Sequence, residues 1–159
     1  MPKVGVVAIM HVALVEPEIA PNTGTIARLC AATGAQLHLV GRLGFHLDDR
    51  RLRRAGVDSW DRVTVLRHAD WSAFAEALAG VRFWLFSTRA ARFYTTADYR
   101  AGDCLVFGSE SRGLPASLLE RHADRALLIP MPAGGVRSLN LATAAGIALY
   151  EALRQINGW

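Results

Sequence analysis

The sequence is poor in cysteine and lysine and has no long uninterrupted apolar run. Its two cysteines, Cys30 and Cys104, lie in apolar segments without CxxC or Cys/His partner spacing, which fits a reduced cytoplasm better than a disulfide framework or a zinc site. The longest apolar stretch, residues 4–15, is interrupted by His11 and is too short to span a bilayer. It continues into Glu16-Pro17-Glu18 rather than into the small-residue cleavage site of a signal peptide. The sequence therefore predicts a cytoplasmic protein with no membrane partner and no metal.

What is present is apolar material and positive charge. The 159 residues are 52% hydrophobic and 20% charged, which excludes a disordered chain and predicts one packed domain over residues 1–159. The formal charge is +4, and 17 of the 18 basic residues are arginines, a bias that a GC-rich genome also produces. Surplus positive charge favours phosphate backbones. Asp48-Asp49-Arg50-Arg51-Leu52-Arg53-Arg54 holds four of the arginines; such a run is usually a solvated helix face, but its density favours contact with nucleic acid.

Short apolar runs alternate with helical segments along the chain. The predicted strands are residues 12–15, 37–40, 63–66, 83–86, 104–107 and 126–129, and the predicted helices are residues 23–33, 49–55, 71–79, 115–121 and 139–155. Continuous apolar runs are typical of strands covered on both faces, so the alternation predicts an α/β fold with a mainly parallel sheet flanked by helices. Asn22 and Asp70 are the predicted N-caps of the first and third helices, and Gly34 and Gly80 are predicted to end them.

The last predicted helix carries only two charges, both near its C-terminal end. A helix that is apolar around most of its circumference is buried on more than one side. In a chain of this size the second partner is either another subunit, which we favour, or the rest of the same chain.

Three loops that follow predicted strands, residues 16–28, 107–115 and 129–140, concentrate unusual residues. Ligands of open α/β sheets bind at the carboxyl ends of strands, and glycines in the second loop would let backbone amides approach a ligand. The chain has no GxGxxG after its first strand and no GxxxxGK[ST], which argues against an ordinary dinucleotide or P-loop site, and Ser109 does not match GxSxG. Residue types alone therefore predict an α/β protein with a glycine-lined site and a basic surface.

Taken together, the three loops resemble the three signature motifs of the SPOUT superfamily of RNA methyltransferases. The matching segments are Asn22-x-Gly24-x-x-x-Arg28, then Phe107-Gly108-x-Glu110-x-x-Gly113-Leu114, then Ile129-Pro130-Met131 leading to Ser138-Leu139-Asn140. The similarity runs over residues 12–155. Three further segments are similar in particular to the small tRNA 2'-O-methyltransferases that act on the wobble nucleotide. They are Glu16-Pro17-Glu18-Ile19-x-Pro21-Asn22-Thr23-Gly24, Gly44-Phe45 and Arg51-Leu52-Arg53-Arg54-Ala55-Gly56.

This resemblance implies a C-terminal deep trefoil knot (the SPOUT, or α/β-knot, fold), a homodimer, and S-adenosyl-L-methionine as the methyl donor. The implied reaction methylates the ribose 2'-hydroxyl of the wobble nucleotide, a cytidine or modified uridine at position 34 of tRNA. By position in the motifs, Phe86, Gly108, Ile129 and Ser138 would bind the donor, and Glu110 would order the second loop.

The resemblance also gives Arg28 the role of engaging the target phosphate and activating the 2'-hydroxyl, with Asn140 aligning the substrate or the donor. Because a guanidinium stays protonated in proteins, we favour stabilisation of a developing alkoxide over base catalysis. The alternative for Arg28 is a surface ion pair with Glu16 or Glu18.

The basic segment is expected to contact phosphates of the anticodon stem-loop. Tyr150 is expected to face the substrate across the dimer, unless its side chain is buried. The arginines of that segment are Arg50, Arg51, Arg53 and Arg54. Methylation of another tRNA or rRNA ribose, and a catalytically silent knotted RNA-binding protein, are the alternative functions.

Some positions depart from the pattern of the small tRNA methyltransferases. The loop at residues 132–137 looks one residue longer, and Ala142 and Thr143 stand where Ser and Asn are expected. Met10 lies close to where relatives begin, so the residues before it are either an artefact of start-site assignment or an extra edge strand.

Overall fold

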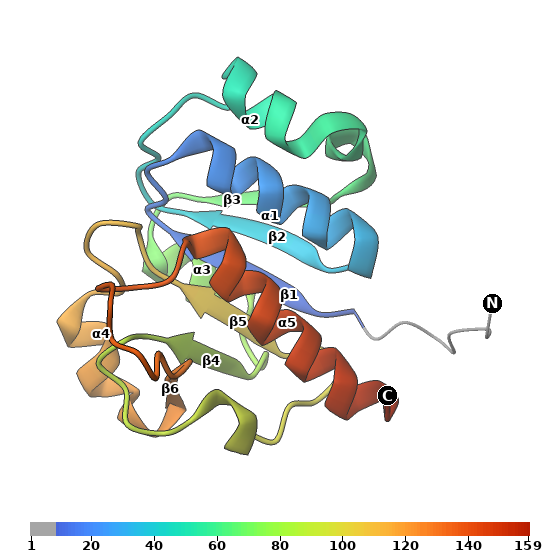
Figure 1. The fold of residues 1–159 in the computed structure, drawn as a ribbon. Helices are drawn as coiled ribbons and strands as arrows, with labels where there is room; N and C mark the ends of the chain where they lie inside the picture. The colour runs from blue at the N-terminus through green and yellow to red at the C-terminus, as the bar shows by residue number, and fades with distance from the viewer. Residues whose placement is uncertain (1–8) are drawn as a thin grey trace.

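The computed structural model describes residues 9–159, apart from the side chains of residues 56–59. Six strands form one sheet in the order β3-β2-β1-β5-β4-β6, and every pairing within it is parallel (Figure 1). The strands are β1 (His11–Val15), β2 (Gln36–Val40), β3 (Val65–His68), β4 (Phe83–Phe86), β5 (Cys104–Phe107) and β6 (Ala126–Leu127).

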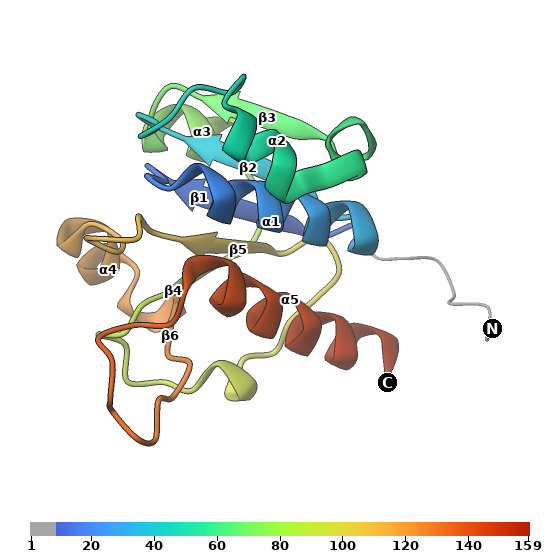
Figure 2. The same cartoon turned by 45° about the horizontal axis from the view of Figure 1, so that its top comes forward.

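Helices cover both faces of the sheet. They are α1 (Ala20–Thr33), α2 (Arg50–Gly56), α3 (Trp71–Ala77), α4 (Ala116–Arg121) and α5 (Leu141–Asn157), with 3-10 turns η1 (Val57–Arg62), η2 (Tyr94–Thr96) and η3 (Ala123–Arg125). On one face α1 and α5 lie side by side, with α2 against the far flank of α1 (Figures 1 and 2). The other face packs against α3 and α4.

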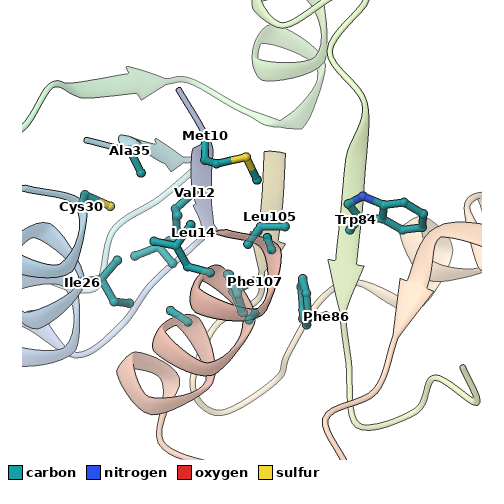
Figure 3. Packing of buried hydrophobic residues seen from close by; sticks show 14 of the residues in the cluster. Met10, Val12, Leu14, Ile26, Cys30, Ala35, Trp84, Phe86, Leu105 and Phe107 are labelled. Atoms are coloured by element: carbon teal, nitrogen blue, oxygen red, sulfur yellow. The ribbon is translucent and has the colours of Figure 1, made fainter. Parts of the chain in front are cut away.

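Alternation along the strands divides the core between these two faces. Val12 and Leu14 of β1 point toward α1 and α5, whereas Ala13 and Val15 point toward α3 and α4. Figure 3 shows the first of these clusters, in which Ile26 of α1 meets the side chains of β1. Because both faces are covered, β4 and β5 consist of apolar residues throughout, and β1 is apolar from Val12 to Val15.

The predicted α/β class with a parallel sheet flanked by helices is confirmed, and the strands at residues 83–86 and 104–107 have the predicted bounds. The third strand begins at Val65, two residues later than predicted. The last strand ends at Leu127, because Leu128 leaves the ladder and forms an isolated bridge with Phe93 instead. The trefoil knot implied by the resemblance stays a prediction.

Two of the four predicted helix boundaries are confirmed. The Asp70 carboxylate accepts from the Ala73 N–H (2.8 Å) and caps α3, and Gly34 ends α1 in the left-handed conformation, with φ of 77°. Asn22 is not the N-cap of α1, because that helix already begins at Ala20. Gly80 does not end α3 either; the helix stops at Ala77, and Gly80 lies in the turn that follows.

Within residues 9–159 no helix is both long and apolar enough to cross a membrane. The thiols of Cys30 and Cys104 are free and buried, and burial raises both pKa values, that of Cys30 to about 12. The extra edge strand considered for the residues before Met10 lies in residues 1–8, outside the described residues.

Candidate functional site

A cavity of about 750 Å³ opens at the carboxyl ends of three neighbouring strands, β5, β4 and β6. The loop after each strand forms a wall, and the N-terminal end of α5 closes the fourth side. The lining segments are residues 86–89 after β4, residues 107–114 after β5, Leu128, Ile129 and Met131 after β6, and residues 137–141. Ile19 and Asn22 after β1 also line the cavity, so all three loops singled out in the sequence meet at one site.

All four residues predicted to bind the donor line this cavity: Phe86, Gly108, Ile129 and Ser138. The ring of Phe86 stacks on that of Phe107, with centroids 4.8 Å apart and planes 15° apart (Figure 3). The two rings give the cavity an apolar wall, and the exposed Ser138 adds a hydroxyl on the side of α5.

Gly108 is required by the loop itself. A Cβ at this position would lie 2.0 Å from the carbonyl carbon of Gly113 and 2.2 Å from the nitrogen of Leu114. The loop folds back on itself here, with the Gly113 N–H donating to the Ser109 carbonyl (2.9 Å). Thus the glycine permits a close approach between two parts of the backbone, where the sequence had suggested an approach to a ligand.

Glu110 connects the second loop to the first. Its carboxylate accepts from the backbone N–H groups of Glu18 (2.9 Å) and Ile19 (2.6 Å). Ile19 is the N-cap of α1 and offers no side-chain cap of its own, so Glu110 satisfies the start of that helix. Glu110, to which the resemblance gave the role of ordering the second loop, thereby ties the second loop to the first.

Glu18 returns the same kind of contact to the second loop. Its carboxylate accepts from the Ser111 hydroxyl (2.5 Å) and the Ser111 N–H (3.0 Å). These two hydrogen bonds hold the pKa of Glu18 below its ordinary value, and the bond from the hydroxyl has the larger effect.

A chain of amides extends this network to α5. The Asn140 side-chain oxygen Oδ1 accepts from the Thr143 N–H (3.2 Å), so Asn140 is the N-cap of α5. The Asn140 Nδ2 donates to the Asn22 side-chain oxygen Oδ1 (3.0 Å), and the Asn22 Nδ2 donates to the Glu110 carboxylate (3.4 Å). Asn140 lines the cavity, but both ends of its side chain are engaged in holding the two helices and the loop.

Arg28 lies outside this cavity. Because α1 starts at Ala20, Arg28 stands more than two turns into the helix, on its exposed side. It makes no ion pair among the described residues, so the alternative pairing with Glu16 or Glu18 is wrong.

The predicted RNA-contacting residues also lie outside the cavity. The arginines Arg50, Arg51, Arg53 and Arg54 are all exposed on α2. Arg51 pairs with Asp49 (3.1 Å), and the guanidinium of Arg53 lies 5.2 Å from the centre of the Trp60 ring. Tyr150 is 48% exposed on α5, so the alternative of a buried Tyr150 does not hold within one chain.

Sequence reasoning missed the exchange of contacts between Glu18, Glu110 and Ser111. The residues are more than ninety positions apart, and no local pattern joins them. The signal that could have found them is two glutamates at the carboxyl ends of strands that are neighbours in the sheet.

A parallel α/β sheet with a cavity built from the loops after its strands defines a ligand-binding protein of the doubly covered α/β type. The model of the SpoU rRNA Methylase family matches residues 9–150, and the chain belongs to this family.

Curated relatives match over nearly their whole length. A tRNA (cytidine(34)-2'-O)-methyltransferase of Saccharophagus degradans is 49% identical, over 92% of this chain and 95% of that protein. The protein of the same name from Escherichia coli K12 is 45% identical, over 92% of this chain and 94% of its own.

Solved structures similar to this chain are also those of RNA methyltransferases. One described by the words "Structural insights into the 2-OH methylation of C/U34 on tRNA" superposes with a TM-score of 0.92 and 48% identity, over 97% of this chain and all of that one. An AdoMet-bound rRNA methyltransferase from Sinorhizobium meliloti superposes with a TM-score of 0.82 and 33% identity, over 94% of this chain and 57% of that one.

Proposed function

We propose that the protein transfers the methyl group of S-adenosyl-L-methionine to the ribose 2'-hydroxyl of nucleotide 34 of a tRNA, in the cytoplasm. The observation that carries the proposal is the near full-length similarity to relatives named for this reaction. The cavity at the carboxyl ends of β5, β4 and β6 supplies the matching site.

The cavity fits a donor of this kind. Its volume of about 750 Å³ lies within the range of about 300–1,000 Å³ for small-molecule sites. Phe86 and Ile129 offer apolar surface to an adenine ring, the glycine-containing loop at Gly108 offers backbone, and Ser138 offers a hydroxyl. Bound there, the donor supplies a methyl group attached to a sulfonium sulfur, and this sulfur departs readily as a neutral thioether.

The protein has to align the hydroxyl with that methyl group, because a ribose hydroxyl is a poor nucleophile at neutral pH. The carbon–oxygen bond forms as the carbon–sulfur bond breaks, the electron pair stays on sulfur in the neutral thioether, and the hydroxyl proton passes to solvent. Arg28 is assigned to the target phosphate and to the negative charge that grows on the oxygen. Asn140 is assigned a positioning role, since its amide already caps α5 and holds Asn22.

We also propose a homodimer formed through α5, which agrees with this assignment. The helix buries one side on the sheet and leaves Tyr150 (48% exposed) on the other, and Trp159 (57% exposed) follows the C-cap of the helix at Gly158. These two aromatic rings lie 6.4 Å apart and form an apolar patch. Because α1 lies beside α5, a second copy seated there would lie next to α1, the helix that carries Arg28 (Figure 1). The exposed arginines of α2 are assigned to phosphates of the anticodon stem-loop.

Methyl transfer to total tRNA from a strain that lacks the gene, followed by nucleoside mass spectrometry, tests the proposal. A product at a ribose other than that of nucleotide 34 would favour the first alternative function. Absence of both donor binding and product would favour a silent RNA-binding protein.

A further inference from the structure

A second cavity, of about 370 Å³, lies next to the first at the carboxyl ends of β2, β1 and β5. Glu16 and Glu18 contribute to it after β1, Arg42 after β2, and Ser109 and Arg112 after β5. Ser109 and Arg112 also line the first cavity, so the loop after β5 is a wall common to both. The volume is sufficient for a small organic ligand.

Glu16 enters this cavity from an unusual backbone conformation. Its φ is 52°, and it is the one non-glycine residue with positive φ in the described part of the chain. Such a conformation costs of order 1–3 kcal/mol and persists where the surroundings enforce it. A side chain at Gly41 would meet the Glu16 Cγ at 3.0 Å, so Gly41 leaves the space that the Glu16 side chain needs.

The charged groups here are unequally engaged. The Glu18 carboxylate is held by Ser111, whereas the Glu16 carboxylate has no hydrogen bond or ion pair among the described residues. Within the same residues, Arg42 and Arg112 have no carboxylate within 4.0 Å. The cavity thus presents one free acceptor group and two free donor groups.

This balance selects the class of ligand. Two carboxylates facing two guanidinium groups leave no net positive charge, and the carboxylates would repel a phosphate. An uncharged ligand that both donates and accepts hydrogen bonds fits such a set. Among the parts of a nucleotide, the ribose hydroxyls and the base have this character, but only the base offers an amino group beside ring and carbonyl acceptors. Carboxylates pair with the amino group of cytosine, while arginine pairs with ring and carbonyl acceptors.

We infer that the second cavity binds the base of the nucleotide whose ribose is methylated. Glu16 accepts from the exocyclic amine of cytosine, and Arg42 and Arg112 donate to the acceptors of the same ring. The inference rests on the proposed function, because the ribose joined to that base must reach the donor cavity across the common wall. A uracil carries a carbonyl where cytosine carries the amine, so Glu16 contributes to binding of cytosine and not of uracil.

The test compares anticodon stem-loops with C or U at position 34. Binding is measured by fluorescence anisotropy in the presence of S-adenosylhomocysteine, and methyl transfer is measured as kcat/KM with S-adenosylmethionine. Glu16→Gln and Glu16→Gly are expected to lower the ratio of C34 to U34 by about tenfold in both measurements. Glu16→Gly also removes the backbone strain, so its thermal unfolding should be unchanged or shifted upward.

Glu120→Gln, on the exposed side of α4 and outside both cavities, is the matched control and should leave the ratio unchanged. An equal effect of the Glu16 variants on C34 and U34, or no effect, overturns the inference. The inference is also overturned if the Glu16 variants change discrimination between C and U at nucleotide 35 and not at nucleotide 34. If the wild type discriminates in binding through Glu16 but transfers no methyl group, the base site stands and the proposed function fails.

Discussion

Glu18 and Glu110 exchange hydrogen bonds between the loops after β1 and β5. The Glu18 N–H donates to the Glu110 carboxylate (2.9 Å), while the Glu18 carboxylate accepts from the N–H of Ser111, the residue after Glu110 (3.0 Å). Each glutamate therefore fixes the backbone of the other's loop. The pair lies between the two cavities and connects the start of α1 to the loop that lines both.

Replacing Glu110 with Ala should weaken both the fold and donor binding. The substitution removes the acceptor for the Glu18 and Ile19 N–H groups at the start of α1, and the loss of a helix cap costs about 1 kcal/mol. Urea denaturation and titration calorimetry with S-adenosylhomocysteine measure the two effects. Glu120→Ala is the control, and an unchanged donor affinity in Glu110→Ala would contradict the role given to this network.

Gly108→Ala should disrupt the loop after β5, because its methyl group would lie 2.0 Å from a backbone carbon of Gly113. We expect donor affinity to fall at least about tenfold, since the whole wall must move. Gly135→Ala is matched to it, because a Cβ there meets nothing within 4 Å. Calorimetry with S-adenosylhomocysteine compares the two variants, and equal affinities would show that the loop tolerates the clash.

The folded state should lose stability as the pH falls from 6.5 to 4, because of a chain of three histidines across β1, β2 and β3. His11 Nδ1 lies 3.0 Å from His38 Nε2, and His38 Nδ1 lies 2.9 Å from His68 Nε2. Burial first, and then the neighbouring His11 and His68, lower the pKa of His38 from 6.5 to about 4. In this window the unfolded chain binds a proton that folded His38 does not, so the folded state loses stability as the pH falls.

For His38 alone the loss is at most about 1.4 kcal/mol per pH unit. Burial also lowers the pKa of His11 and His68, so both act in the same direction. Urea midpoints measured from pH 7.5 to pH 4.5 give the change in stability per pH unit for the wild type, for His38→Gln and for the exposed control His46→Gln. A slope that persists unchanged in His38→Gln would assign it to other groups.

Introducing a charge on the outer side of α5 should produce monomers. Ile147→Glu places a carboxylate in the apolar stripe that includes Tyr150, where an interface would bury it unpaired. Analytical ultracentrifugation of the wild type, Ile147→Glu and the control Leu66→Glu, on the edge strand β3, measures the assembly. A dimer that survives in Ile147→Glu but not in Leu66→Glu would locate the interface on the sheet edge.

Local patterns were sufficient for the elements whose residues determine their own structure. The apolar runs of β4 and β5 and the Asp70 cap act over a few positions, and all were predicted. The start of α1 was mispredicted: the helix has no side-chain N-cap, and the N–H groups just before it are held by Glu110, about ninety residues further along the chain.

The candidate site divides in the same way. The motif positions Phe86, Gly108, Ile129 and Ser138 converge on one cavity, as the strand–loop order led us to expect. The physical reason for Gly108 and the second cavity depend on how loops approach one another in space, which spacing along the chain does not encode.

The most direct test of the central claim is a nucleoside digest with mass spectrometry, after incubating the protein with S-adenosylmethionine and total tRNA from a strain that lacks the gene. We predict a new 2'-O-methylcytidine or 2'-O-methylated modified uridine that maps to position 34 and is lost with Arg28→Ala while donor binding is kept. Donor binding without any new 2'-O-methylated nucleoside at position 34 would contradict the account.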